Sequence, residues 1–275
     1  MVKQNSNTHL PTLKKLSIQI GLSGLSFSIL EVNTHTLLKL KQFKKDRTLN
    51  PFEILDYLKF IIDTEQLANH TYEQVTVIYR NDLVTLVPDA FFDEDSLAEY
   101  LKFNNKILAT DFIAFDKIND TAVVYVPLVN VNNFLFDTFG SFTYKHFATQ
   151  FIEYITSQNE ATEEPVVTIH VEENVFEMLI TKNKDIQFYN TFAFTTPEDF
   201  IYYILFTLEQ MQYNPEAILL HFYGTLTPTS DLYAIAYKYI RNVEIKTNSF
   251  SFVNPNEIQI PESSNLALLS SFLCE

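Results

Sequence analysis

The 275-residue sequence has few of the residues that stabilise a fold through disulfide bonds or bound metal ions. It contains one cysteine, Cys274, which cannot form an internal disulfide and indicates a reducing compartment. Its six histidines form no HExxH motif and no close His/Cys cluster, so we expect no metal site. Tryptophan is absent and glycine occurs 4 times, against 25 Phe and 15 Tyr. With 47% hydrophobic residues, the composition indicates an aromatic-rich α/β protein and names no activity.

Long apolar runs and positive charge are also scarce. The longest uncharged apolar stretch with a helical pattern covers residues 200–208, far short of the roughly 20 residues that span a bilayer. Residues 1–13 lack an apolar run after their lysine, so we expect a disordered tail and not a secretory signal. Lys plus Arg is 19 and Asp plus Glu is 34, a net charge of −15 that argues against nucleic acid as a partner. These features predict a cytoplasmic protein without membrane insertion.

The first half of the chain begins with three alternating segments and a helix. Residues 16–20, 26–32 and 36–43 alternate apolar and polar side chains, which predicts an antiparallel meander of strands. Asn50 and Pro51 are typical of an N-cap and first helical position, and apolar residues follow at helical spacing.

The second half repeats this βββα order. Strands are predicted at 166–171, 176–181 and 186–194, and Thr196 with Pro197 again begins an amphipathic helix. The two helical segments that start at Pro51 and Pro197 share a weak internal repeat. We therefore predict two similar lobes related by pseudo-duplication: residues 14–160 with connecting elements, and residues 161–275.

The order of elements and one hairpin resemble the actin-like ATPase superfamily, whose fold is ribonuclease H-like. The segment SIQIGLSGLS (17–26) resembles the hairpin that wraps nucleotide phosphates there, in the version of cytoplasmic actin-like pilus-assembly proteins. More specifically, residues 97–116, 125–149, 189–210 and 239–243 resemble an uncharacterised bacterial family, a domain of unknown function with an actin-like ATPase fold. The resemblance implies this fold for most of the chain after residue 13, and it implies no established activity.

Compared with the phosphate hairpin of the actin-like superfamily, the first hairpin of this sequence is incomplete. Gly21 and Gly24 are present, with Ser23 and Ser26 beside them, and glycines in such hairpins let backbone N–H groups approach phosphate oxygens. Gln19, however, stands where the family has an aspartate that holds magnesium, and an amide brings no charge to a metal.

The second hairpin and the nucleoside segment depart further. His170 stands at the aspartate position and Glu172 at a glycine position, where a carboxylate adds bulk and negative charge beside phosphates. Tyr223 and Gly224 follow the strand that precedes the nucleoside pocket, with one glycine where the family is glycine-rich. We therefore predict a degenerate, vestigial nucleotide site with no catalytic residues and no cofactor, ATP with magnesium being the disfavoured alternative.

The remaining candidates concern partners. Tyr202 and Tyr203 are adjacent on a helix that already has a full apolar stripe, so at least one must point away from the core. They are interface candidates, although packing between the lobes explains them equally well. The hypotheses are a non-catalytic scaffold for an unknown protein partner, which we favour, an ATP-binding switch or ATPase with a noncanonical hairpin, and a homodimer without ligand.

Overall fold

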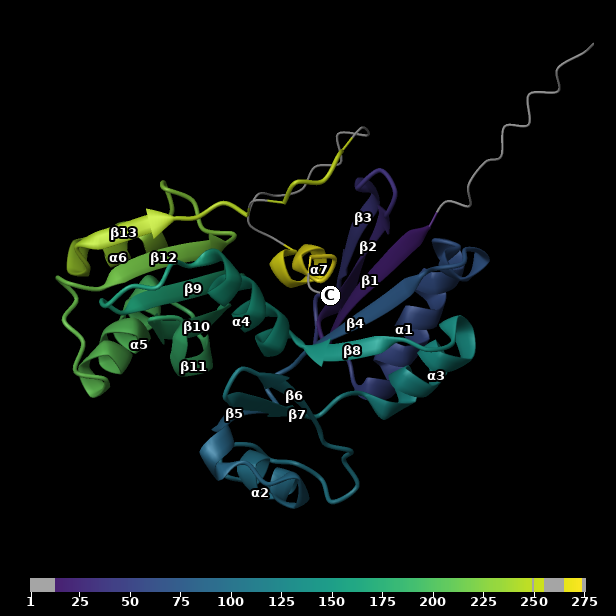
Figure 1. Cartoon of the computed structure of the whole chain (residues 1–275), viewed down its shortest axis with the longest axis horizontal. Coiled ribbons are helices and arrows are strands. Elements are labelled where there is room, and N and C mark those ends of the chain that lie inside the picture. The colour runs from purple at the N-terminus through teal and green to yellow at the C-terminus, as the bar shows by residue number, and fades with distance from the viewer. Residues whose placement is uncertain (1–12, 249, 255–264, 274–275) are drawn as a thin grey trace, which may run out of the picture.

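The computed structural model describes residues 13–248, 250–254 and 265–273. Of the predicted tail, only Leu13 belongs to this part, and Cys274 lies outside it. Three sheets with flanking helices form a lobe on the right of Figure 1, a lobe on the left and a smaller unit below them. Among the described residues, no helix has the length and apolarity needed to cross a bilayer.

The first sheet has five strands in the order β3-β2-β1-β4-β8. Strands β1, β2 and β3 form the predicted antiparallel meander, whereas β4 and β8 run parallel to β1. The bounds are β1 Lys14–Gly21, β2 Gly24–Glu31, β3 Thr36–Lys44, β4 Gln74–Arg80 and β8 Thr143–His146.

The second sheet repeats this order and these directions as β11-β10-β9-β12-β13. Its meander is β9 to β11, and β12 and β13 lie parallel to β9. The bounds are β9 Val166–Glu172, β10 Val175–Lys182, β11 Asp185–Ala193, β12 Leu219–Gly224 and β13 Asn242–Ile245. The matching topology is the predicted βββα layout, while the lobe boundary at residue 160 stays a prediction.

A third, three-stranded sheet interrupts the first half and was not expected as a separate unit. Its order is β5-β7-β6, with all neighbours antiparallel. A core of its own, which includes Leu101 and Val124, lies between this sheet and helix α2 (Leu97–Lys102). The bounds are β5 Val84–Pro88, β6 Ala114–Ile118 and β7 Thr121–Tyr125.

The helices begin at the signals that the sequence carries. Asn50 forms a complete capping box with Glu53 at the start of α1, and Thr196 does the same with Asp199 at α5. Each box satisfies backbone N–H groups that would otherwise lack partners. The bounds are α1 Pro51–Thr64, α2 Leu97–Lys102, α3 Val129–Phe139, α4 Phe147–Gln158, α5 Pro197–Gln210, α6 Asp231–Tyr239 and α7 Leu266–Ser270, with single-turn 3₁₀ helices η1 Leu67–Asn69, η2 Asp89–Phe91 and η3 Glu94–Ser96.

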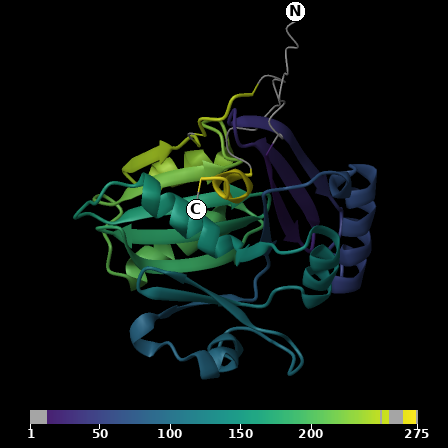
Figure 2. The ribbon, with the colours of Figure 1, turned by 45° about the vertical axis from the view of Figure 1, so that its right-hand side comes forward.

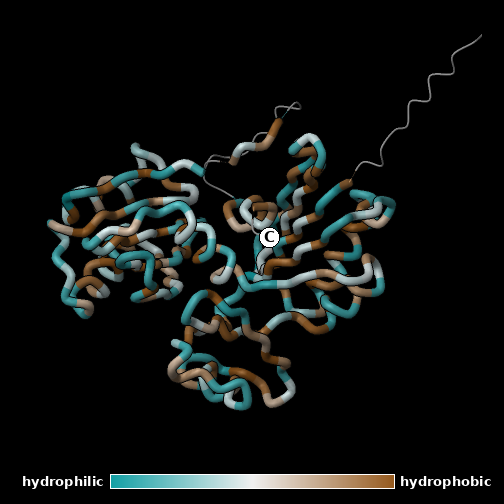
Figure 3. The backbone as a smooth tube through the Cα atoms, in the orientation of Figure 1, coloured by the Kyte–Doolittle hydropathy of each residue, from teal (hydrophilic) through white to brown (hydrophobic). Residues whose placement is uncertain are grey.

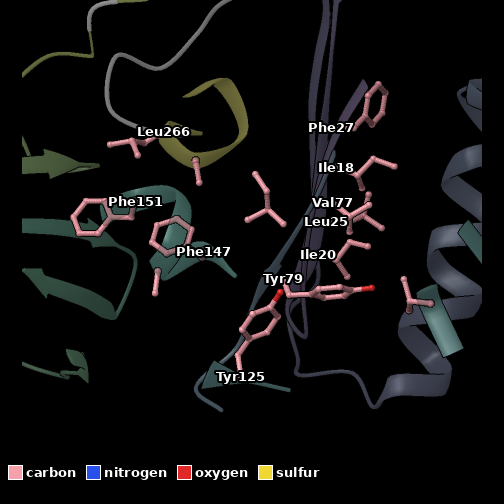
Figure 4. Packing of buried hydrophobic residues seen from close by; sticks show 14 of the residues in the cluster. Ile18, Ile20, Leu25, Phe27, Val77, Tyr79, Tyr125, Phe147, Phe151 and Leu266 are labelled. Carbon is pink, nitrogen blue, oxygen red and sulfur yellow. The ribbon is translucent and has the colours of Figure 1, made fainter. Parts of the chain in front are cut away.

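One hydrophobic core reaches from the first sheet into the second lobe. Helix α4 joins β8 to β9 and contributes Phe147 and Phe151 to the core that also holds Tyr79 and Tyr125 (Figure 4). The second lobe contributes Leu179 to this cluster, and α7 adds Leu266. Hydrophobic stretches alternate with hydrophilic ones along many of the strands (Figure 3), as expected for sheets with buried faces. The view in Figure 2 shows α7 beside the first sheet, with which it shares contacts.

Gly224, at the end of β12, is expected to be intolerant of any side chain. Its φ is +100°, and a Cβ would lie 2.0 Å from the Val171 carbonyl oxygen. Gly140 has φ +78° with open space around it. We expect Gly224→Ala to lower the free energy of unfolding by roughly 3 kcal/mol or more and Gly140→Ala by about 1–2 kcal/mol. Urea denaturation of both variants measures the difference; equal losses would contradict the steric account.

Candidate functional site

A cleft of about 1100 Å³ opens where the two sheets point their hairpin turns toward each other. Its walls include the β1–β2 and β9–β10 turns, the end of β3, and strands β5 and β11. All five candidate residues of the first hairpin line it: Gln19, Gly21, Ser23, Gly24 and Ser26. The structure thus brings together at one cleft the two hairpins that the sequence singled out.

An arginine at the end of β4 connects the hairpins. The Arg80 guanidinium forms an ion pair with Glu172 at the end of β9 and another with Glu177 on β10, the latter at 2.6 Å between Nη2 and Oε1. It also lies over the Phe147 ring, 4.4 Å from the ring centroid. The carboxylate of Glu172 is therefore neutralised by a cation from the opposite lobe.

His170 is buried behind this arginine. Its Nδ1 lies 2.9 Å from Oε2 of Glu177, so one carboxylate bridges the imidazole and the guanidinium. The rings of Phe147 and Phe151 pack against the imidazole at 5.4 and 5.8 Å between centroids. His170 is thus a satisfied interior histidine, held by Glu177 of its own sheet and by two rings of α4, and it does not belong to the described lining of the cleft.

The electrostatics of Glu177 follow from these neighbours. Burial alone would raise the pKa of the Glu177 carboxyl, but Arg80 and His170 outweigh burial and lower the pKa to about 2. Nearby, burial raises the pKa of the Tyr189 phenol, and the negative charge of Glu177 raises it further. The lining of the cleft therefore includes an ionised carboxylate shared by two partners and a neutral phenol.

A second, more exposed ion pair also joins the two lobes at the cleft. Lys44, at the end of β3, pairs with Glu173 in the β9–β10 turn at 2.6 Å between Nζ and Oε1. Gln42 on the same strand approaches Glu172 at 3.5 Å. The polar groups of the first lobe therefore contact the second hairpin directly, on the side where the family resemblance places phosphates.

The nucleoside and interface candidates lie elsewhere. Tyr223 is buried at the end of β12, and neither it nor Gly224 belongs to the described lining of the cleft. Tyr202 is 59% exposed on α5, whereas Tyr203 packs on Phe192 at 5.1 Å between ring centroids. One tyrosine of the pair points away from the core, as the helical pattern predicted, and its role as an interface residue stays a prediction.

Arg80 and Glu177 were missed by the sequence reasoning, although each leaves a signal. Glu177 interrupts the apolar run of β10, and a carboxylate inside such a run needs a buried partner. Arg80 directly follows the apolar residues of β4, at the carboxyl end of a strand parallel to β1. No spacing rule links the two residues, because 97 positions separate them and the fold alone brings them together.

A buried polar junction supports the cleft from the side of the small sheet. The Asp116 carboxylate accepts hydrogen bonds from the Thr149 hydroxyl, the His146 backbone N–H and the Tyr125 hydroxyl. Burial raises the pKa of Asp116 against the effect of these donors, and burial lowers the pKa of His146 to about 4. A neutral His146, with Nε2 3.1 Å from the Asn81 carbonyl oxygen, ties the start of α4 to the end of β4.

Removing the charge of Glu177 is expected to destabilise the protein strongly. Glu177 is buried and the Arg80 guanidinium is partly buried, so Glu177→Gln leaves Arg80 with a weaker partner on the buried side, and the free energy of unfolding should fall by about 3 kcal/mol. The exposed Lys44–Glu173 pair offers a matched control, and Glu173→Gln should cost at most about 1 kcal/mol. Urea denaturation at neutral pH compares the two; similar losses would show that Glu177 is not an organising residue.

Glu177 also sets an acid limit on stability. Its folded pKa of about 2 lies below its ordinary value of 4.5, so its contribution is complete above pH 4.5 and is lost as pH falls toward 2. The shift corresponds to about 3 kcal/mol. We expect the unfolding free energy of the parent to fall more steeply over this pH range than that of Glu177→Gln, measured by denaturant titrations. Parallel pH profiles would contradict the assignment.

Two solved structures align with most of this chain. A structure from Bacteroides thetaiotaomicron VPI-5482, described as a protein with actin-like ATPase fold and unknown function, aligns with a TM-score of 0.81 and 20% identity, covering 96% of this chain and 97% of that chain. A chain of the PilM–PilN type IV pilus biogenesis complex aligns with a TM-score of 0.53 and 11% identity, covering 86% and 89%. A search of curated proteins found no match.

These alignments confirm the predicted fold class: the protein has an actin-like ATPase fold. The predicted family resemblance is confirmed as well. Residues 3–243 match the family described as "Protein of unknown function (DUF3822)". The chain therefore belongs to the DUF3822 family.

Proposed function

We propose that this protein is a non-catalytic, protein-binding scaffold with a degenerate nucleotide site. The observation that carries the proposal is the position of Arg80, paired with Glu172 and Glu177 between the two hairpins. The positive charge that a phosphate group would need at this point is already compensated by two carboxylates of the protein. A phosphate would have to displace carboxylates from a partly buried cluster of ion pairs, one of whose members, Glu177, is buried, and that displacement is costly.

The residues at the hairpins do not suit magnesium-bound ATP. Gln19 offers an uncharged amide, and His170 is engaged with Glu177 inside the lobe. The described residues contain no group of three His, Cys, Asp or Glu side chains arranged to hold a metal ion. Magnesium prefers carboxylates together with phosphate oxygens. The three glutamates of the cleft are bound to Arg80 and Lys44, which leaves Asp82 as the lining carboxylate outside these pairs.

Two further observations support protein binding. The solved neighbour from the PilM–PilN complex shows that a chain of this fold takes part in a two-protein complex. In the present protein, Tyr202 stacks on Phe206 at 5.8 Å between ring centroids, and both rings are about half exposed. Exposed aromatic side chains of this kind are enriched among the residues that anchor protein interfaces.

The alternative, an ATP-binding switch, is favoured by one observation. The cleft is larger than the roughly 300–1,000 Å³ of typical small-molecule sites. Gly21 and Ser23 line it, so the first hairpin is accessible to a ligand. This alternative requires nucleotide binding beside an intact Arg80–Glu172 pair, or exchange of that pair for phosphate contacts.

Thermal unfolding with millimolar ATP and magnesium separates the two functions. A bound ligand stabilises the folded state by RT ln(1 + [L]/Kd), so a scaffold should show no change in Tm. Gly21→Asp, which puts a carboxylate into the first hairpin, is the control for specific binding. A rise in Tm in the parent that is lost in Gly21→Asp, or ATP turnover by the purified protein, would overturn the scaffold proposal.

A further inference from the structure

Two strands at the cleft expose unpaired edges. The three sheets have six edge strands in the described part of the chain: β3, β8, β11, β13, β5 and β6. Residues of β11 and of β5 both line the cleft, and the two strands lie near one another in the lower left of Figure 1. A free strand edge presents a row of backbone N–H and C=O groups that can pair with another extended chain.

Charge distinguishes these two edges from the other four. Strand β3 has Lys39, Lys41 and Lys44, and β6 has Asp116 and Lys117. Strands β8 and β13 are four residues long and each contains a charged residue. Charge and shortness are the usual means of blocking an edge. By contrast, β5 has no charged residue, and neither do residues 186–193 of β11.

The alternation of hydrogen-bonded and non-hydrogen-bonded residue pairs along β10 and β11 shows which backbone groups of β11 point outward. The Phe194 N–H donates to the Asn174 carbonyl, which makes this pair a hydrogen-bonded one. Because such pairs alternate along antiparallel strands, the backbone groups of Tyr189, Thr191 and Ala193 point away from β10. The Thr191 N–H donates to the Asn190 side chain at 2.9 Å, which confirms its outward direction.

The same reasoning applies to β5. The Val126 N–H donates to the Leu83 carbonyl oxygen, and the Asp89 N–H donates to the Asp120 carbonyl oxygen. These bonds show which residue pairs of β5 and β7 are hydrogen-bonded. The groups of Val84 and Leu86 therefore point to the open edge, and Pro88, which has no N–H, ends it. In the described part of the chain, no backbone hydrogen bond from another segment reaches either edge.

From these edges we infer that the cleft binds one extended, uncharged peptide segment of a partner protein by strand addition along β11, with β5 as the opposite wall. The charges of the lining support an uncharged segment, because three cations, Lys44, Lys45 and Arg80, nearly balance the four carboxylates of the lining, Asp82, Glu172, Glu173 and Glu177. Of these cations, Lys44 and Arg80 are paired directly with the glutamates. Side chains that can bond a peptide backbone also line the cleft: Asn104, Asn105, Asn174 and Gln187. Backbone pairing supplies affinity in this mode, and side-chain contacts supply specificity. The inference rests on the proposed scaffold function and names its partner class and its site.

The test uses the full-length protein and a phage-displayed library of random 12-residue peptides. Selected peptides should be rich in uncharged residues, and their affinities are measured by fluorescence anisotropy. Thr191→Pro removes an outward N–H, which in the free protein bonds to the Asn190 side chain, without removing a bond to β10, so it should weaken binding about tenfold. The matched control is Val243→Pro on β13, at the far edge of the same sheet, where the Lys246 bond to Phe222 also places the residue's N–H outward. It should bind like the parent.

Hydrogen exchange on the parent protein gives a readout independent of the variants. A bound peptide should protect backbone amides in residues 186–194 and 83–88. The inference is overturned if no peptide is enriched, if Thr191→Pro binds as tightly as Val243→Pro, or if these amides gain no protection. If the peptide experiments fail and ATP does not change the Tm, only the strand-addition site is rejected. If ATP raises the Tm of the parent protein, the proposed scaffold function itself is rejected.

Discussion

The contact between Arg80 and Glu177 is the constraint on which the arrangement of the cleft depends. A guanidinium and a carboxylate lose their hydration when they are buried, and only close pairing offsets this loss. Arg80 belongs to the first sheet and Glu177 to the second, so the two hairpins have to meet for this ion pair to form. Phe147 and His170 complete the enclosure, and both hold the pair from the side of the shared core.

The topology explains why these groups converge. In each sheet the first strand of the meander has a parallel neighbour, so the carboxyl ends of β1 and β4 lie together, as do those of β9 and β12. Arg80 ends β4 and Glu172 ends β9, which places both side chains at the facing edges of the sheets. Helix α4 runs from one sheet to the other and fixes their distance through its buried residues. The geometry of the fold thus creates a meeting point whose chemistry is set by a few side chains.

The sequence predicted the parts of this arrangement that depend on local patterns. The two meanders, the capped helices α1 and α5, the fold class and the family were all recognised from alternation, caps and motif-like segments. The small sheet was missed as a unit because its strands are each five residues long, and the short helices η2, η3 and α2 separate β5 from β6. The ion pairs were missed for a different reason. A pairing between Arg80 and Glu177 depends on long-range contacts, and no local period encodes it.

The glycines show why a conserved-looking hairpin need not imply a phosphate site. In Gly24 the backbone has φ +152°, and a Cβ would lie 2.3 Å from the Phe43 carbonyl oxygen. At Gly21 a Cβ would lie 3.3 Å from the carbonyl oxygen of Arg80, and Gly224 lies against β9. Strand packing therefore explains each of these glycines without a nucleotide. The meander needs these glycines for its turns and close approaches whatever lies beside them, so the side chains at Gln19, His170 and Glu172 are the better guide to chemistry.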